Sequence, residues 1–323
     1  MTASDREVGQ LAAACLLRRE PSGARLTLQR SAYSTSAPVD ELTVRLADGS
    51  THQLIRKDLH PDFALPQARG IRPPFLHDPM REVVVYRDVL PADLDAPAYL
   101  GSVVDPTMNR YWLLLERVSG LLLWQEGDFA TWIQVARWLS RFHASALSEA
   151  MPPAARAHLL AYDRAFYERW LALANAALPG AARAAIRPVF AAHAALVDWL
   201  VSLPLTFIHG EFFPSNVIVS GEGAAARVAV IDWETAGMGT GLLDLAALVE
   251  GWPQPERLAL VRAYREEVGD HGNEERFLAD LDACRLHLCI RWLGWARDWR
   301  PPAEHERDWV GLALELARGL DVT

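Results

Sequence analysis

The stretch His209-Gly210-Glu211-Phe212-Phe213-Pro214-Ser215-Asn216, followed sixteen residues after Asn216 by Asp232, carries most of the information in this 323-residue sequence. Its polar residues stand among short apolar runs that predict strands, at 205–208, 217–219 and 228–231. Short strands would hold the loops that bear the two acids and the amide in a rigid frame. Such a set suits phosphoryl transfer, in which one carboxylate orients a hydroxyl while an amide oxygen and a second carboxylate hold Mg²⁺ on nucleotide phosphates.

The composition excludes several classes of protein. Hydrophobic residues make up 51% of the chain, enough to bury a large core, and the length favours two domains. A net charge of −9 argues against nonspecific nucleic-acid binding, because a polyanion would be repelled. The three cysteines lack the paired spacing of a metal site, which favours a reduced, cytoplasmic location. No signal-like segment and no apolar run of membrane-spanning length is found, so we expect no membrane contact.

The first part of the chain predicts sheet. An Asp48-Gly49 turn signal joins an alternating run at 41–46 to a return strand at 53–59, which carries Lys57. Lys57 is the only lysine in a chain rich in arginine, so its retention is notable. Three further elements are predicted: a strand at 26–29, a helix at 79–90 and a strand at 111–118.

The rest of the chain is predicted to be mainly helical around the strand cluster. Asp128 is the expected N-cap of the first helix, and Pro188 should kink or restart the third. The predicted helices span 128–147, 154–178, 181–201, 242–250, 255–268, 274–297 and 305–320. This is an α+β organisation with a small sheet-rich part and a larger helical part.

Two motifs together resemble the aminoglycoside phosphotransferase family, small-molecule kinases with the protein-kinase-like fold. The family pattern is His-Gly-Asp, four residues and Asn, followed by an Ile-Asp-aromatic-acid run, here Ile231-Asp232-Trp233-Glu234. Weaker matches are Lys57, Glu82, the run at 114–120 and Asp244. The resemblance spans roughly residues 26–297. It implies a bilobal fold with an antiparallel-sheet, nucleotide-binding N-terminal lobe at 1–118 and a helical, catalytic and substrate-binding lobe at 119–323.

The resemblance assigns the nucleotide contacts to the first lobe. Lys57 would contact the α- and β-phosphates, and Glu82 would pair with Lys57 and fix its rotamer. A solvated strand lysine and a solvated helix carboxylate are the plainer readings of these two residues. Ser34, Thr35 and Ser36 occupy the place of the phosphate-covering loop, although a simple hairpin loop is nearly as good an account. Glu116 and Val118 belong to the predicted hinge, whose backbone would meet the adenine.

The resemblance makes Asn216 and Asp232 the Mg²⁺ ligands, since both supply hard oxygen atoms. An Asx-turn asparagine and a helix-capping aspartate are the structural alternatives. His209 is interpreted as an anchor of the catalytic loop, and Asp244 as a second anchor.

Glu211 departs from the family, which has aspartate as the base that accepts the proton of the substrate hydroxyl. Both acids are ionised near neutral pH, so the chemistry is retained. One extra methylene moves the carboxylate by roughly 1 Å, a displacement that can cost about 10²-fold in rate. Either the pocket is reshaped around Glu211, or the chain binds nucleotide or ligand with little catalysis.

Tryptophans gather near the carboxyl end, where Trp292, Trp295 and Trp299 share one helical face at i, i+3 and i+7. They predict either core packing or an aromatic wall beside the substrate.

The sequence as a whole predicts a cytoplasmic ATP- or GTP-dependent kinase of a small-molecule hydroxyl, with an aminoglycoside, another antibiotic or an amino sugar as acceptor. We expect a monomer or homodimer. The rival is a catalytically silent binding protein that keeps the kinase-like fold. Protein phosphorylation is disfavoured, because only eleven residues separate Asp232 from Asp244 and leave no long activation segment.

Overall fold

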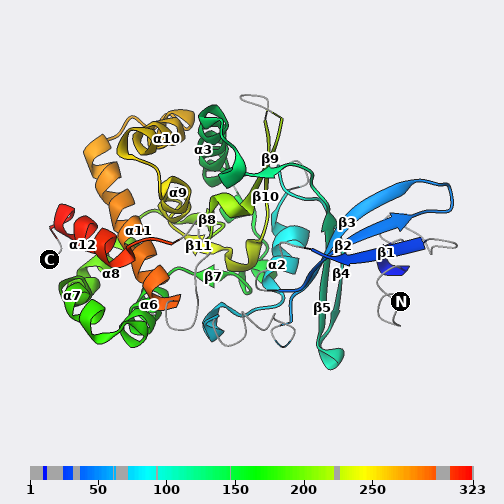
Figure 1. Ribbon diagram of the computed structural model, residues 1–323, viewed down its shortest axis with the longest axis horizontal. Helices are drawn as coiled ribbons and strands as arrows, with labels where there is room; N and C mark the ends of the chain where they lie inside the picture. Colours follow the sequence, from blue (N-terminus) through cyan, green and yellow to red (C-terminus); the bar gives the residue numbers. More distant parts are fainter. Residues whose placement is uncertain are drawn as a thin grey trace. The chain divides into compact units, whose positions relative to one another are not determined.

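The computed structural model describes residues 10–12, 25–31, 37–60, 62, 72–91, 94–145, 147–221, 226–295 and 306–321. The chain folds as two compact units (Figure 1). The first unit comprises Met1–Gly120 together with Met151–His158 and Ala229–Glu234, and the second comprises Leu121–Ala150, Leu159–Val228 and Thr235–Thr323. The predicted phosphate-covering residues Ser34, Thr35 and Ser36 lie outside the described residues, as does Trp299.

The first unit is built on a five-stranded antiparallel sheet in the order β1-β2-β3-β5-β4. The predicted hairpin is confirmed: Gly49 takes a φ of 87°, and the Asp48 carboxylate accepts the N–H of Ser50 at 2.9 Å. The strand β4 was not predicted from the sequence. The strands are β1 (Arg25–Arg30), β2 (Val39–Arg45), β3 (Thr51–Asp58), β4 (Tyr99–Asp105) and β5 (Arg110–Glu116).

Alternation along these strands places apolar side chains in one core. Leu42, Leu54 and Leu114 are buried there together with Trp112. The predicted helix at 79–90 is confirmed as α2 (Arg81–Val84), which continues as the π-helical turn η3 (Val85–Val89). Every residue of α2 is buried, including the charged ones. Buried charges need partners, and those of α2 build the site described below.

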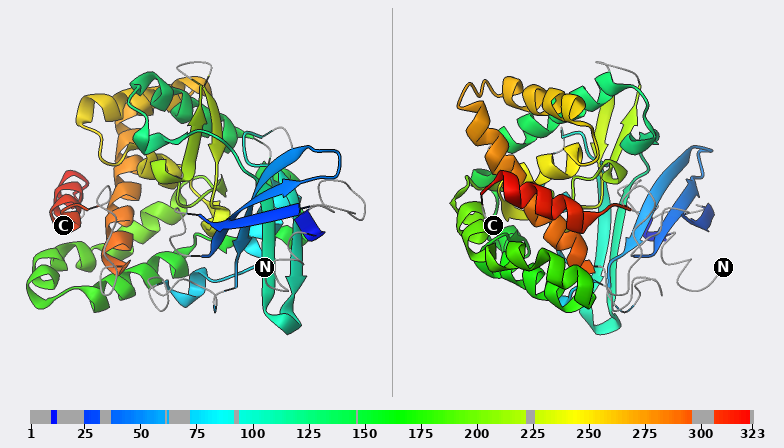
Figure 2. Two further views of the ribbon diagram at one scale, coloured as in Figure 1. Left: turned by 45° about the vertical axis from the view of Figure 1, so that its right-hand side comes forward. Right: turned by 60° about the vertical axis from the view of Figure 1, so that its left-hand side comes forward.

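The second unit is mainly helical, and α11 (Glu274–Trp295) runs through it against α6, α9 and α12 (Figure 2). The Asp128 carboxylate caps α3 by accepting the N–H of Ala130 at 3.0 Å, which confirms the predicted N-cap. The remaining helices are α3 (Phe129–Ala144), α4 (Leu147–Ala150), α6 (Arg164–Ala177), α7 (Gly180–Ala191), α8 (His193–Ser202), α9 (Leu242–Val249), α10 (Gln254–Glu267) and α12 (Trp309–Gly319).

The prediction of a single helix at 154–178 is wrong. The short helix α5 (Pro153–Arg156) ends early, the strand β7 (Leu160–Ala161) follows, and α6 begins only after Asp163, whose carboxylate accepts the N–H of Phe166 at 2.9 Å. Pairing of β7 with β11 (Gly237–Gly239) overrides the helical propensity of the Ala/Leu-rich sequence. The last helix also starts later than predicted, at Trp309, because Asp308 caps it there.

Pro188 lies inside α7, and the chain restarts as α8 at an angle of 51°. No single helix in the described ranges is long and apolar enough to cross a bilayer, although α7 and α8 together meet the length and composition criteria as a bent pair. Their residues Ile186, Val189 and Leu196 are buried within the protein.

Two small sheets, in the orders β10-β9-β6 and β7-β11-β8, frame the loop at 209–216. We call it the catalytic loop after the role that the sequence predicts for it. The loop joins the end of β8 to the start of β9, as the apolar runs predict. The remaining strands are β6 (Leu121–Leu122), β8 (Thr206–Ile208), β9 (Val217–Ser220) and β10 (Arg227–Val230).

Candidate active site

The first unit holds a cluster of three charged side chains around the single lysine. The Lys57 Nζ on β3 lies 2.7 Å from the Glu82 Oε1 on α2 and 2.7 Å from the Asp232 Oδ1, which follows β10. The side chains of Lys57 and Glu82 are almost completely buried, while that of Asp232 is 28% exposed. The fold therefore brings together three of the residues singled out from the sequence.

Burial and charge act on the cluster in opposite directions. Burial alone would lower the pKa of Lys57, but the neighbouring carboxylates of Asp232 and Glu82 outweigh it and raise this pKa. Burial raises the pKa of Glu82 to about 7, against the attraction of Lys57 and with the help of the Asp232 charge. Among the described residues the buried Glu82 Oε2 has no hydrogen-bond partner. Of the two acids that share the ammonium, Asp232 is the more exposed, so it is the one that a cation could reach.

Asp232 also has an unusual backbone. Its φ of 68° lies in the left-handed region, which residues other than glycine seldom adopt. Such strain persists where the surroundings impose it, and it clusters at functional sites. The next residue, Trp233, is fully buried and donates its indole N–H to the Val230 carbonyl at 3.1 Å, which holds the turn in place.

Arg81 fixes the chain just after Asp232. Its buried guanidinium donates to the carbonyl oxygens of Glu234 at 2.7 Å and Leu76 at 2.9 Å. The side chain of Glu234 forms an ion pair with Arg72. Sequence reasoning did not identify Arg81 as a positioning residue, because its partners are backbone atoms that no side-chain pattern reveals.

The second unit holds the catalytic loop, whose backbone conformation is tightly determined. Gly210 has a φ of 84°, and a Cβ there would lie 2.0 Å from the Tyr162 hydroxyl and 2.5 Å from the Thr235 carbonyl oxygen. The fully buried Asp244 carboxylate accepts the N–H groups of His209 and Gly210, each at 2.8 Å. The anchoring role predicted for Asp244 is confirmed by these contacts.

His209 supports the same loop. Its buried ring accepts the N–H of Glu211 through Nδ1 at 3.2 Å, and its carbonyl oxygen accepts the Thr235 hydroxyl at 3.2 Å. These bonds to neighbouring backbone and hydroxyl groups confirm that His209 has an architectural role.

The Glu211 side chain forms an ion pair with Arg291 of α11. The second terminal nitrogen of Arg291, Nη1, donates to the Gly210 carbonyl at 2.7 Å, and its guanidinium lies over the Trp170 ring, 5.4 Å from the centroid. Arg291 is 6% exposed, so its position is fixed by packing on all sides. The longer glutamate side chain is thus held by a buried arginine 80 residues away in sequence. Sequence reasoning missed this partner, since no local spacing encodes it.

Asn216 lies at the end of η6 (Pro214–Asn216) in the same loop. Its side-chain amide donates to the Glu211 carbonyl oxygen at 2.9 Å. That bond uses the amide nitrogen and leaves the amide oxygen as the donor atom for a cation. Within the described ranges no group of three or more His, Cys, Asp or Glu side chains forms a metal cluster. Mg²⁺ does not require one, because it commonly takes one or two protein oxygens together with water and substrate phosphates.

The two predicted hinge residues differ in how far their backbone is engaged. Glu116 ends β5, where its N–H donates to the Ala98 carbonyl at 2.9 Å and its carboxylate accepts the Ala98 N–H at 3.2 Å. Val118 follows the strand and is partly buried. Its backbone therefore lies beyond the ladder of the sheet, where a ligand could pair with it.

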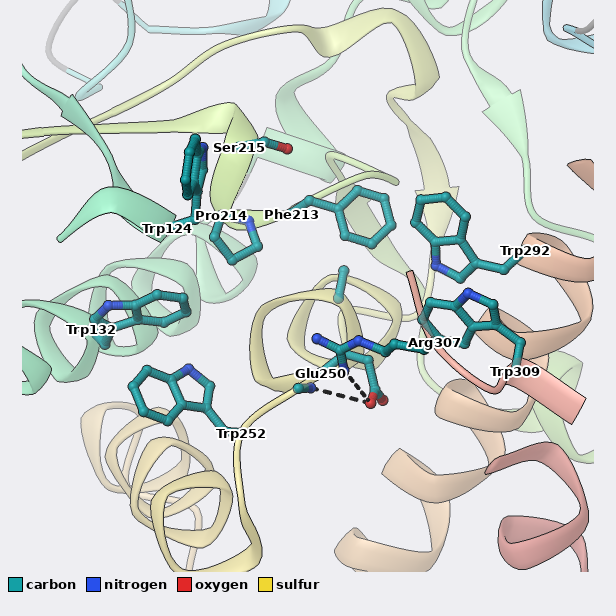
Figure 3. A pocket seen from close by; sticks show the side chains of 12 residues that line it. Trp124, Trp132, Phe213, Pro214, Ser215, Glu250, Trp252, Trp292, Arg307 and Trp309 are labelled. Carbon is teal, nitrogen blue, oxygen red and sulfur yellow. Dashed lines mark hydrogen bonds and ion pairs between the residues drawn. The ribbon is translucent and has the colours of Figure 1, made fainter. Parts of the chain in front are cut away.

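A pocket of about 240 Å³ opens beside the catalytic loop in the second unit (Figure 3). We call it the aromatic pocket, because six rings line it: Trp124, Trp132, Phe213, Trp252, Trp292 and Trp309. Trp292 lies in its wall, whereas Trp295 packs against Trp170 with ring centroids 5.6 Å apart. Trp295 thus packs against another ring, as the core prediction expects, while the aromatic wall beside the substrate stays a prediction. The sequence did not reveal that Trp124, Trp132 and Trp252 line one pocket, since they come from separate elements.

A family model described as "Phosphotransferase enzyme family" matches residues 55–286 of this sequence. The match covers most of the chain, including Lys57, Glu82 and the whole catalytic loop. The chain belongs to the phosphotransferase enzyme family. The predicted family resemblance is thereby confirmed. A search of curated proteins returned no match.

Solved structures confirm the fold class. A choline/ethanolamine kinase family protein from Mesorhizobium loti is similar with a TM-score of 0.58 and 19% identity, over 99% of this chain and 94% of its own. An amicoumacin kinase solved with AMP-PNP and Ca²⁺ has a TM-score of 0.57 at 12% identity, over 92% and 87%. A point mutant of aminoglycoside 2′-phosphotransferase-IIIa, solved with GDP, has a TM-score of 0.54 and 12% identity, over 92% of this chain and 91% of its own. At such identities the likeness establishes a protein-kinase-like α+β fold.

Proposed function

We propose that this phosphotransferase family member is a kinase that moves the γ-phosphoryl group of ATP or GTP to a hydroxyl of a small molecule. The observation that carries the proposal is the burial of the only lysine, with its ammonium 2.7 Å from both Glu82 and Asp232. A buried ammonium shared by two acids costs desolvation and serves no evident packing need. It suits a group that binds phosphate oxygens as a point charge.

The nucleotide would be held by the first unit. In this proposal Lys57 contacts the α- and β-phosphates, and Glu82 keeps the ammonium in place. The backbone of Glu116 and Val118 pairs with the base, and Ser34, Thr35 and Ser36 cover the phosphates. Similar proteins were solved with GDP and with AMP-PNP, which supports a nucleotide donor without choosing between adenine and guanine.

Asn216 and Asp232 are the proposed Mg²⁺ ligands. Their amide and carboxylate oxygens are hard donors, which suit a divalent cation such as Mg²⁺. The metal would neutralise charge on the transferred phosphoryl group. The Ca²⁺ in the similar amicoumacin kinase structure supports a divalent metal in this family.

Glu211 is the proposed base toward the acceptor hydroxyl. Phosphoryl transfer through a loose transition state needs the hydroxyl oriented more than it needs a strong base. Arg291 restricts the rotamers of the longer side chain, and it also offers the carboxylate a fixed partner. The pair therefore compensates for the added methylene by holding Glu211 in one place.

The ion pair also gives the rival function its best support, because a carboxylate engaged by a buried arginine is less available to a substrate. A silent binding protein would be stabilised by nucleotide yet transfer no phosphoryl group, and Glu211→Asp would restore nothing. A kinase would transfer the group in its wild-type form.

The test is a turnover assay with Mg-ATP and Mg-GTP across a panel of hydroxylated small molecules, read by ³¹P NMR. Asp232→Asn should abolish most transfer, whereas Asp198→Asn, at a surface carboxylate with 67% exposure, should leave it intact. Equal transfer by wild type and Asp232→Asn would contradict the proposed mechanism.

The proposed setting is the cytoplasm. Cys284 and Cys289 are buried free thiols, and burial raises the pKa of both well above the usual thiol value, which keeps them inert. Free thiols of this kind are typical of a reducing compartment. A hydroxylated antibiotic or amino sugar as acceptor, and a monomer or homodimer as the assembly, stay predictions.

A further inference from the structure

We propose that the aromatic pocket binds an uncharged, ring-bearing portion of the phosphoryl acceptor. This inference rests on the proposed function for its link to catalysis, but the binding itself can be tested alone. It favours a neutral aromatic alcohol as the acceptor over the amino sugar predicted from the sequence.

The rings of the pocket converge from distant parts of the second unit. Trp132 and Trp252 meet edge to face with centroids 4.9 Å apart, and Trp292 stacks on Trp309 at 5.4 Å and 13°. The rings of Phe213 and Trp292 have centroids 5.4 Å apart. Figure 3 shows these side chains arranged around a shared space. Aromatic faces and edges arranged in this way offer offset-stacked and edge-to-face contacts to a flat guest.

Trp124 is the most open member of the set, with 44% of its surface exposed. Large indoles are usually well buried, because exposing them to water forfeits much of their favourable transfer free energy. A half-exposed tryptophan on the edge of an aromatic pocket would gain burial when a ligand binds. Binding of a ring-bearing guest would therefore bury this indole.

The charges beside the pocket are already satisfied. Among the described residues that line it, Glu250 is the only acid. One of its oxygens lies 3.0 Å from the Arg285 Nε and the other 3.1 Å from the Arg307 Nη1. Figure 3 shows Arg307 reaching Glu250 beside the rings. No free carboxylate is left among these lining residues to receive an ammonium group.

A cationic guest would also face repulsion. The Arg307 guanidinium lies over the Trp309 ring, 5.8 Å from its centroid, so it already occupies a position that favours a cation. An ammonium entering the pocket would lose its hydration shell next to this fixed positive charge. A neutral ring meets neither cost, because dispersion and apolar burial do not depend on charge.

The position of the pocket links it to the acceptor. Phe213, Pro214 and Ser215 line it, and all three lie between Glu211 and Asn216 in the chain. A guest in the pocket therefore contacts the loop that carries the proposed base. A hydroxyl attached to that guest would be held close to the loop, which is the positioning that phosphoryl transfer requires.

The size of the pocket limits the guest. The pocket has a volume of about 240 Å³. It lies below the range of about 300–1,000 Å³ found for drug-sized ligands. One ring or a fused pair fits, whereas a multi-ring sugar would extend well beyond the rings.

The test compares two aromatic alcohols of nearly the same shape, 2-phenylethanol and N-(2-hydroxyethyl)pyridinium, which differ in charge. Binding to the full chain is measured without nucleotide by calorimetry and by tryptophan fluorescence. We expect 2-phenylethanol to bind about tenfold more tightly. Equal or tighter binding of the pyridinium alcohol, or no binding of either up to about 10 mM, would overturn the inference.

Two variants locate the effect. Trp124→Ala should weaken 2-phenylethanol by about fivefold, whereas Leu205→Ala, at another exposed apolar residue outside the pocket, should not. Arg307→Gln should tighten the binding of the pyridinium alcohol by about fivefold, because the substitution frees one oxygen of Glu250. It should leave the affinity for the neutral alcohol unchanged. Unaltered affinities in both variants would show that the probes bind elsewhere and would overturn the inference.

The outcome is separable from the proposed function. Selective binding of the neutral alcohol without phosphoryl transfer would leave the pocket assignment intact and count against the kinase. Transfer to cationic alcohols with no preference for neutral ones would support the kinase and overturn the pocket assignment.

Discussion

The lysine cluster of the first unit and the catalytic loop of the second unit depart from the family pattern to different extents. The cluster keeps the lysine and both acids of that pattern and joins them at hydrogen-bond distance. The loop keeps its histidine, glycine and asparagine but carries Glu211, which pairs with Arg291. The lysine cluster, which forms the donor side of the proposed reaction, therefore follows the family pattern. The catalytic loop, which belongs to the acceptor side, departs from it at Glu211.

The contrast extends to what holds each region. Lys57 is held by acids that the family pattern already contains. Glu211 is held by a residue from α11, the same helix that supplies Trp292 to the aromatic pocket. One helix, α11, therefore supplies both the ion-pair partner of Glu211 and a wall of the aromatic pocket.

The largest expected effect comes from breaking the lysine cluster. Lys57→Met leaves Glu82 and Asp232 without their shared ammonium and should lower nucleotide-dependent turnover on the order of 10³-fold. Arg45→Met, at an exposed basic residue on the neighbouring strand β2, is the control and should change turnover little. Steady-state kinetics with saturating acceptor gives both values. A loss of less than tenfold would remove Lys57 from the mechanism.

The backbone of the catalytic loop should be the next most sensitive feature. Gly210→Ala places a Cβ 2.0 Å from the Tyr162 hydroxyl and should destabilise the fold by about 3 kcal/mol or more. Gly49→Ala is a matched control, since Gly49 also has positive φ but nothing lies within 4 Å of the added Cβ. It should cost only about 1 kcal/mol. Urea denaturation measures the two losses, and equal losses would contradict the crowding at Gly210.

The ion pair can be tested by a double-mutant cycle. Arg291→Gln should lower kcat/KM by about 10²-fold when residue 211 is glutamate, because the longer side chain then loses its fixed position. In the Glu211→Asp background the same change should cost only a few-fold, since a shorter carboxylate depends less on Arg291. Similar losses in both backgrounds would show that Arg291 acts only on overall packing.

The smallest expected effect is the pH dependence that Glu82 gives to stability. Its pKa rises from 4.5 to about 7 in the folded protein. The folded state therefore binds this proton more tightly, and the stability that results is full below pH 4.5 and is lost as the pH rises through about 7.

Glu82→Gln removes this titration, so its free energy of unfolding should fall less than that of wild type between pH 5 and about 7.5, by roughly 1–3 kcal/mol. The exposed Glu266→Gln variant should keep the wild-type slope. Denaturant titrations at both pH values provide the comparison, and parallel slopes for wild type and Glu82→Gln would contradict the raised pKa.

Much of the donor side could be predicted from the sequence, because its signals are local. The Asp48-Gly49 turn sets the register that places Lys57, and the run Ile231-Asp232-Trp233-Glu234 marks the second acid of the cluster. The helical prediction at 154–178 failed because the pairing of β7 with β11 is a tertiary event. Ala/Leu-rich propensity cannot reveal such a pairing.

The acceptor side could not be predicted in the same way. Arg291 reaches Glu211 across 80 residues, and Arg307 reaches Glu250 across 57. These contacts depend on how α11, α12 and the catalytic loop pack, which no short motif encodes. Trp124 and Trp252 look like ordinary core residues in the sequence, and only the fold turns them toward one pocket.

The most direct test of the central claim is transfer of the γ-phosphoryl group from Mg-ATP or Mg-GTP to an alcohol by wild type and Glu211→Gln, followed by ³¹P NMR, with nucleotide affinity measured in parallel. We predict transfer by wild type and a loss of about 10²-fold or more in Glu211→Gln, with nucleotide affinity unchanged. Equal transfer by the two proteins, or none by wild type while nucleotide still binds, would contradict the account.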